Sequence, residues 1–255
     1  MNETQDEERI GQRRCIFCGA KPLTKEHMLP KWLRDLLGSN QLMHRHGVEG
    51  PEETYERSEW DATPASQTLK LLCSDCNNNW GGSIEAAAKP ILLAMIRGEE
   101  TRLSREEQAV VSLWMAKTMM VFDRSHPRTS VIPDDDLRHA RANNEPPPTA
   151  VGWLSNYSGE KYVAVHVSSA SPYAIPGENK SDPGWVSSLV VESLMMQMVK
   201  RPGLLDDAPR FFDETGDLNV QVWPPTDDYI VWPPTRAKDD GFVEAVSFPT
   251  GEASR

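Results

Sequence analysis

Long hydrophobic runs are missing from this chain of 255 residues. No stretch approaches the roughly 18 consecutive apolar residues that a transmembrane helix requires. The opening segment, MNETQDEERI, is polar and acidic, so it lacks the basic start and the apolar middle of a secretion signal. We therefore expect no membrane span and a cytoplasmic location.

A surplus of positive charge is also missing, because 38 acidic residues outnumber 27 basic ones and the net charge is −11. This balance argues against a surface coated with cations for nucleic acid. The charge is uneven, however, since residues 11–46 carry seven Lys or Arg residues against two acidic ones. A local basic footprint can hold phosphate, although scattered solubilising charge is the alternative. The basic residues predicted to contact nucleic acid are Arg13, Arg14, Lys31 and Arg34.

Cysteine is scarce, and the few cysteines form a pattern with none left over. The two C-x-x-C pairs are Cys15 with Cys18 and Cys73 with Cys76. In a chain without a secretion signal, this pattern predicts a structural zinc site. A two-residue spacer lets both thiolates of a pair reach one ion, and two pairs close its tetrahedral sphere with no position open for water. A redox pair and unrelated buried thiols are the alternatives.

The first part of the chain, residues 12–99, holds all of the polar chemistry. The segment PKWLRDLL (30–37) is predicted to be a helix, because proline suits its first position and a glycine follows its end. Residues 39–67 are polar and contain several Gly and Pro residues, so we expect an irregular insertion there. The alternation in TLKLLC (68–73) predicts a strand, and a helix should begin near Ser83.

The second part, residues 100–255, is predicted to be an accessory domain of helix and sheet. Ser104 and the acidic residues after it fit a capping box for a long helix ending near Asp123. A short helix is expected after Pro133. Residues 150–155 and 161–167 flank a polar turn and resemble a hairpin. A VWPP unit that occurs twice near the end predicts two strands that each stop at a turn.

Three motifs around the cysteines resemble a known family. They are CIFC (15–18), EHMLPKW (26–32) and CSDCNNNW (73–80). Together they resemble the HNH endonuclease superfamily, the ββα-metal or His-Me finger nucleases, over roughly residues 13–97. The resemblance implies a metal-dependent endonuclease, a hydrolase of nucleic-acid phosphodiester bonds with DNA as the expected substrate. It implies that His27 is the general base and that Glu26 and Asn77 hold a catalytic divalent metal.

One position departs from the family pattern. The middle Asn of the family usually stands five residues before the third cysteine, where it helps to orient the base, and this chain has Thr68 there. We expect the Thr68 hydroxyl to do part of that work. Asn79 and Glu85 are further candidates for support around the catalytic metal.

The chemistry of these residue types agrees with the resemblance. A neutral imidazole can accept a proton near pH 7, because its unperturbed pKa is about 6.5. Mg²⁺ or Mn²⁺ prefers oxygen ligands, which a carboxylate and an amide supply. Zinc held by four thiolates would fold two distant pieces of chain together without taking part in the reaction.

These observations predict an α+β fold, in which an N-terminal zinc-stapled ββα module precedes a long helix and a mainly antiparallel β region. Residues 1–11 are expected to form a disordered tail. Residues 100–255 could serve a homodimer or a regulatory protein partner. Two alternatives stay open: a non-catalytic zinc module that binds nucleic acid or a protein, and a defence or toxin nuclease controlled by a partner.

Overall fold

The computed structural model describes residues 14–40, 42–49, 55–63, 67–125, 130–170, 184–200 and 217–247. The expected tail over residues 1–11 and the predicted phosphate contact Arg13 lie outside these ranges. The described chain mixes helices with sheet, which confirms the α+β class. Within the described ranges, no helix combines the length and the apolar character of a membrane span.

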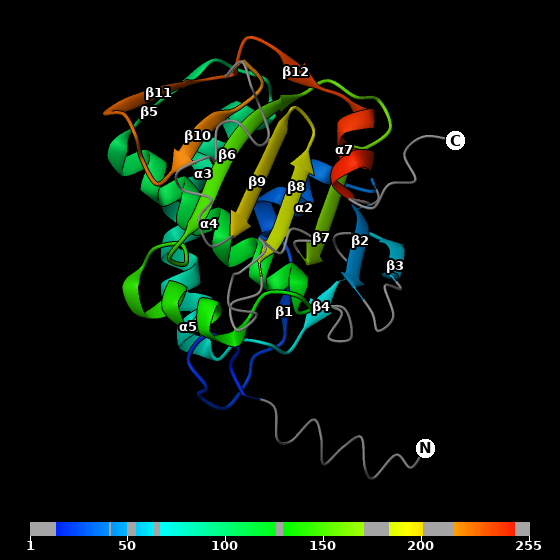
Figure 1. Ribbon diagram of the computed structural model, residues 1–255. Coiled ribbons are helices and arrows are strands. Elements are labelled where there is room, and N and C mark those ends of the chain that lie inside the picture. The colour runs from blue at the N-terminus through cyan, green and yellow to red at the C-terminus, as the bar shows by residue number, and fades with distance from the viewer. Residues whose placement is uncertain are drawn as a thin grey trace, which may run out of the picture.

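An eight-stranded sheet forms the centre of the molecule (Figure 1). Its strands follow the order β10-β6-β9-β8-β7-β2-β3, and β12 pairs with the last two residues of β6, beyond the residues that pair with β10. Pairing is mainly antiparallel, with parallel pairs only at β2–β7 and β6–β12 among these described strands. The strands are β2 (Leu42–Glu49), β3 (Tyr55–Ala62), β6 (Ala150–Tyr157), β7 (Ala164–Ala170), β8 (Trp185–Val191), β9 (Leu194–Lys200), β10 (Val220–Trp223) and β12 (Ala237–Lys238).

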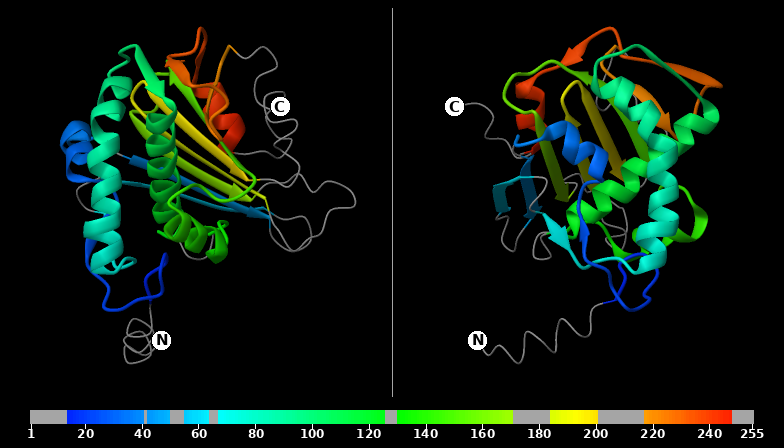
Figure 2. Two further views of the ribbon diagram at one scale, coloured as in Figure 1. Left: turned by 90° about the vertical axis from the view of Figure 1, so that its left-hand side faces the viewer. Right: turned by 180° about the vertical axis from the view of Figure 1, so that it is seen from behind.

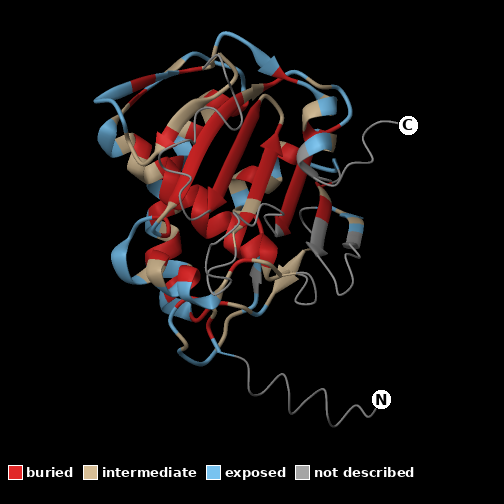
Figure 3. Ribbon diagram, in the orientation of Figure 1, coloured by how far each residue is buried: buried red, intermediate tan, exposed pale blue. Residues whose placement is uncertain are grey.

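The expected hairpin between residues 150–155 and 161–167 is wrong. These segments form β6 and β7, but β8 and β9 lie between them in the sheet. The run SLVVESLMMQMV contains parts of both central strands and the turn that joins them, where Glu192 takes a positive φ of 47°. Both faces of β9 are buried, so its sequence is mostly apolar and does not alternate (Figure 3).

The expected irregular insertion over residues 39–67 is also wrong for its described residues. They contain the antiparallel pair β2–β3, and β2 continues the central sheet by pairing in parallel with β7. In that register His44 lies beside His166, and both histidines are fully buried. Burial lowers the pKa of His44 to about 4, so this ring is a neutral core residue. The sequence did not predict this strand, because polar residues such as His44 and Arg45 stand at its buried positions.

Helix α4 (Arg105–Asp123) lies between the sheet and α3 (Gly82–Ile96), as Figure 2 shows in its left view. Because both of its sides are covered, α4 is apolar nearly all round, and Trp114 at its middle is fully buried. The capping box is confirmed: Glu107 N donates to Ser104 Oγ at 3.3 Å, and Ser104 N donates to Glu107 Oε2 at 2.8 Å. A single core cluster therefore runs from the cysteines through α3 and α4 to the sheet.

The remaining helices sit at the edges of this arrangement. Helix α2 (Lys31–Leu37) and α5 (Asp134–Asn143) match the segments expected to be helical. Helix α7 (Asp240–Ser247) packs on the opposite sheet face from α4 through Val243. Two short pairs complete the fold: β1 (Glu26–His27) with β4 (Thr68–Leu69), and β5 (Thr101–Ser104) with β11 (Tyr229–Trp232). Both VWPP units end a strand, as expected.

The two expected domains share the central sheet. The first part of the chain supplies β2 and β3, and the second part supplies the other six strands. Strands from the two sides of residue 99 pair with each other in this sheet, as β2 does with β7. Whether the two parts fold as separate units therefore stays a prediction.

Candidate metal centre and its polar neighbours

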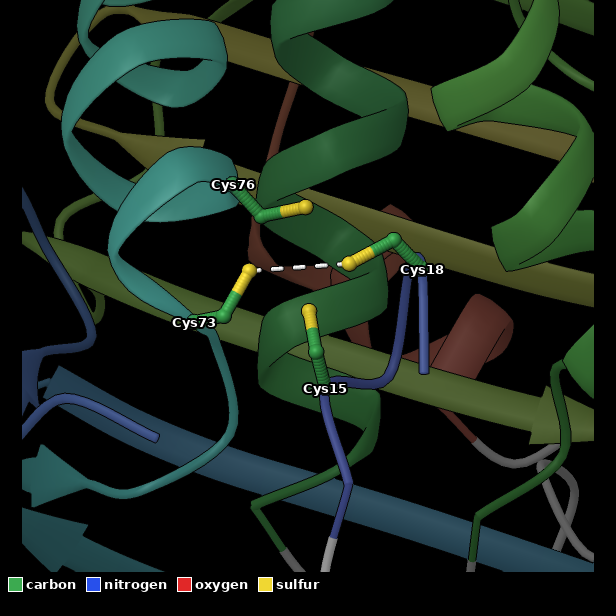
Figure 4. A group of neighbouring side chains, drawn as sticks. All are labelled: Cys15, Cys18, Cys73 and Cys76. Atoms are coloured by element: carbon green, nitrogen blue, oxygen red, sulfur yellow. Dashed lines mark hydrogen bonds between the residues drawn. The ribbon is translucent and has the colours of Figure 1, made fainter. Parts of the chain in front are cut away.

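The four cysteines come together from two distant segments (Figure 4). Their sulfur atoms all lie within 4.8 Å of one another, and Cys18 Sγ is 3.5 Å from Cys73 Sγ. In a tetrahedral zinc thiolate, with bonds of about 2.3 Å, the sulfurs are roughly 3.8 Å apart. All four cysteines are free of disulfides, so this set of donors fits a soft cation and could hold a metal ion such as zinc.

Each pair is shaped by its local backbone. In the first pair, Gly19 N donates to the carbonyl of Cys15 at 2.8 Å, and Gly19 takes a φ of 74° that glycine permits at no steric cost. In the second pair, Cys73 forms an isolated bridge with Leu23, and Cys76 lies on the π-helical turn η2 (Asp75–Gly81). The bridge at Cys73 and the start of η2 at Cys76 therefore place the second pair of sulfurs beside the first.

The thiols share negative charge among themselves. The pKa of Cys15 is lowered to about 4, first by its hydrogen bond with Cys76 and against the effect of burial. The pKa of the Cys76 thiol is raised, because Cys15 holds the charge beside it and because the thiol is buried. A metal cation would take the place of the shared protons, since thiolates are its ligands.

The proposed base lies on a short strand beside this centre. In the β1–β4 pair, Glu26 is opposite Leu69 and His27 is opposite Thr68. Directly opposite residues of an antiparallel pair have their side chains on the same face, with Cβ atoms about 4.5–5.5 Å apart. The Thr68 position is therefore a cross-strand neighbour of His27. Of Glu26 the structure describes the backbone position alone.

The surroundings of His27 favour the neutral imidazole. Its side chain is exposed. Its pKa nevertheless lies below the usual value, first because the surrounding protein displaces part of its water and then because of the positive charges of Arg34 and Lys25. A neutral ring near pH 7 can accept a proton from water.

Asn77 is tied to the strand segment that leads to Glu26. Its Nδ2 donates to Thr24 Oγ1 at 3.4 Å, and Thr24 Oγ1 donates to the carbonyl of Leu72 at 3.0 Å. The Asn77 backbone N–H donates to the carbonyl of Cys73 at 2.9 Å. These bonds turn the amide nitrogen toward Thr24 and leave the carbonyl oxygen, the atom that a hard cation would bind, on the other side of the amide.

The two remaining support candidates have structural partners. Asn79 Nδ2 donates to Asp75 Oδ1 at 3.0 Å and so braces the turn that carries Asn77. Glu85 Oε1 accepts from the buried Lys117 Nζ at 2.7 Å. Glu85 thus links α3 to α4.

The described cations predicted to contact phosphate have different surroundings. Arg14 is exposed and its Nη1 donates to the carbonyl of Gly19 at 3.3 Å, next to the first cysteine pair. Lys31 forms an exposed ion pair with Asp35 at 2.6 Å. Arg34 acts electrostatically on His27. Of these three cations, Arg34 is the one that acts on His27.

Two residues of the second part reach this centre and were missed by the sequence interpretation. Arg141 Nη2 lies 2.8 Å from Asp75 Oδ2, and Trp80 Nε1 donates to Asn144 Oδ1 at 2.7 Å. They are 66 and 64 positions from their partners, and nothing in the local sequence of α5 marks them as neighbours of the cysteines.

Comparisons with protein-family models, with curated proteins and with solved structures each found no match to this chain. The interpretation of the site therefore depends on its residues and their geometry.

Proposed function

We propose that this chain is a metal-dependent HNH-type endonuclease that hydrolyses phosphodiester bonds of nucleic acid, with DNA as the favoured substrate. His27 is the general base, Glu26 and Asn77 are the protein ligands of a catalytic Mg²⁺ or Mn²⁺, and the four cysteines hold a structural Zn²⁺. This assignment extends the resemblance of residues 13–97 to the HNH superfamily.

One arrangement supports the proposal above all others. The pair β1–β4 is followed by η2 and α3, so that two short strands and a helix surround a four-cysteine cluster. The acid-histidine pair lies on the first strand, and the Asn77–Thr24 hydrogen bond connects the helix to the chain just before that pair. A zinc module that only binds a partner would have no need of this placement.

The protein groups divide the reaction between them. The imidazole of His27 takes a proton from a water molecule, and the water oxygen attacks phosphorus as the bond to the leaving oxygen breaks. The role of Thr68 in this proposal is to orient the ring, which its position opposite His27 supports, and Arg34 and Lys25 add positive charge for the phosphate. A bound Mg²⁺ or Mn²⁺ would supply charge that offsets the negative charge developing on the leaving oxygen.

The test compares cleavage of plasmid and of single-stranded DNA and RNA with and without EDTA, followed by added Mg²⁺ or Mn²⁺. We expect cutting that EDTA abolishes and that either ion restores. His27→Ala should lower the rate by about 10²–10⁴, the usual contribution of a positioned base, while the zinc content stays unchanged.

The matched control is His139→Gln, which removes an imidazole that contacts Asn143 and Glu145 on α5 and in the residues after it. It should cut at the rate of the unaltered protein. Full activity in a folded His27→Ala protein would contradict the assignment. Nucleic-acid binding without any cutting would favour the non-catalytic zinc module.

A further inference from the structure

Helix α5 holds the turn that carries Asn77 at both of its ends. At the start of η2, Arg141 pairs with Asp75 at 2.8 Å. At its end, Asn144 accepts the hydrogen bond from the Trp80 indole at 2.7 Å, and the Arg141 guanidinium lies 5.4 Å from the centre of that ring. Asn77 lies between these two points of attachment.

The turn needs such support because of its geometry. Residues Asp75–Gly81 form a π-helical turn, a conformation that is rare and that is frequently found at functional sites. Its own side-chain bonds, from Asn79 to Asp75 and from Asn78 to Ser74, are exposed and so contribute little by themselves. The carboxylate of Asp75 accepts from both Asn79 and Arg141, which joins the internal bonds of the turn to α5.

The position of α5 is set in turn by the central sheet. Asp136 in its first turn is buried, and its carboxylate accepts from Lys200 Nζ and from Trp185 Nε1, each at 2.8 Å. Lys200 and Trp185 belong to β9 and β8. Polar contacts at the start of α5 therefore attach the helix to two central strands, and those at its end attach it to the turn beside the cysteines.

We infer that Arg141 and Asn144 are positioning residues, through which the second part of the chain fixes the orientation of Asn77 and so the affinity of the proposed site for its catalytic metal. This inference rests on the proposed function. It assigns to α5 a role that neither residue type nor spacing indicates.

The test uses the full chain with four substitutions. Arg141→Met removes the charge while keeping the length of the side chain, and Arg141→Lys keeps a cation that can still reach Asp75. Asn144→Gly removes the acceptor for Trp80 and tolerates the left-handed φ of 60° at this position. The control is Arg138→Met on the same helix, because Arg138 pairs with Asp134 and Asp135 on the exposed side of α5.

The first measurement is amide hydrogen exchange of the peptide covering η2. Arg141→Met and Asn144→Gly should raise its exchange rate by about tenfold or more, as expected for loss of a hydrogen bond to a charged or buried group. Arg138→Met should exchange like the unaltered protein. Unchanged exchange in both α5 variants would overturn the inference, whether or not the protein is a nuclease.

The second measurement is the Mn²⁺ concentration that gives half-maximal cleavage. In Arg141→Met we expect it to rise by about tenfold, in the range found when partners of metal ligands are removed, while the rate at saturating Mn²⁺ stays near that of the unaltered protein. Arg141→Lys should recover part of the loss. Faster exchange with an unchanged Mn²⁺ requirement would overturn the role in metal affinity, whereas absence of cleavage in every form would refute the proposed function and leave the exchange test to decide on α5.

Discussion

His27 and Thr68 lie opposite each other in the pair β1–β4, so the residue that departs from the HNH pattern occupies the position next to the proposed base. If the Thr68 hydroxyl orients the imidazole, its loss should slow the reaction without disturbing the strand pair. Thr68→Val keeps the shape and the β-branching and should lower the rate at saturating metal by about fivefold to tenfold, the equivalent of one hydrogen bond.

Thr68→Ser is the matched control, because it keeps the hydroxyl, and we expect a rate near that of the unaltered protein. Equal rates for the Val and Ser variants would show that the hydroxyl has no part in orienting His27. Both variants are compared by single-turnover cleavage at one pH.

Gly81 and Gly82 offer a second test at the scale of a residue. A Cβ atom added at Gly81 would lie 2.8 Å from the backbone oxygen of Cys76 and 3.4 Å from Lys117 Cε, whereas one added at Gly82 meets only the oxygen of Asn77, at 4.0 Å. Gly81→Ala should therefore destabilise the protein by about 1–3 kcal/mol, as overpacking does. Gly82→Ala should be neutral or stabilising by up to about 1 kcal/mol, because alanine favours a helix. Urea unfolding of the two variants tests this difference. Equal unfolding midpoints would contradict the close approach between Gly81 and the backbone oxygen of Cys76.

The site could be predicted from sequence where its chemistry is local. The two C-x-x-C pairs predicted the four cysteines that the structure brings together. The acid-histidine pair beside them predicts a base, and that role stays a prediction. Arg141 could not be predicted, because an arginine on a helix is ordinary and only the packing of α5 brings it to Asp75.

Among the elements, helices were easier to predict than strand partners. The long helix after Ser104 carries its own start signal, and the short helix after Pro133 begins with three aspartates that suit a helix N-terminus. Strand pairing has no comparable local signal. Nothing in residues 150–157 shows that β6 pairs with β9 and not with the nearer β7. Strand β2 was not predicted because it contains polar residues at buried positions, such as His44.

A buried ion pair contributes to the attachment of α5 to the sheet. Asp136 and Lys200 have side chains that are 5% and 9% exposed, and 2.8 Å separates their charged atoms. Asp136→Asn removes the negative charge from this buried pair with Lys200, and breaking a buried ion pair at one partner typically costs about 3–5 kcal/mol.

Asp135→Asn is the control, because that side chain is 93% exposed and its change should stay within about 0.5 kcal/mol. Urea unfolding at neutral pH compares the two variants. A loss of less than about 1 kcal/mol in Asp136→Asn would mean that α5 is held by its apolar contacts alone.

On the scale of the whole molecule, the chain is joined across long sequence distances. Core contacts run without interruption from the cysteines to the sheet, and β2 belongs to the same sheet as β6–β9. Composition predicted enough apolar residues for a core, but it could not show that the two parts would share one. The expected boundary near residue 99 therefore marks where the motifs end, whereas the packed core continues across it.

Glu244 on α7 extends this joining to the last described helix. Its carboxylate pairs with Arg45 of β2 at 2.8 Å and with Lys161, which precedes β7, at 2.5 Å, and it accepts from the Tyr162 hydroxyl. Burial acts to raise the pKa of Glu244, but the hydrogen bonds from Lys161, Tyr162 and Arg45 outweigh it and lower the pKa to about 2. The ionised carboxylate is thus the form that the fold stabilises.

Because of this lowered pKa, the contribution of Glu244 to the stability of the folded protein depends on pH. Since its folded pKa lies below the value of about 4.3 in an unfolded chain, the stabilisation is complete above that value and declines as the pH falls toward about 2. Glu244→Gln should accordingly be less stable than the unaltered protein at pH 7, and the gap between their urea midpoints should narrow between pH 4.3 and pH 2. The neighbouring exposed Glu160→Gln serves as the control and should show no such gap. A gap for Glu244→Gln that stays constant from pH 7 to pH 2 would mean that its carboxylate does not act as an ionised tie between α7, β2 and the segment before β7.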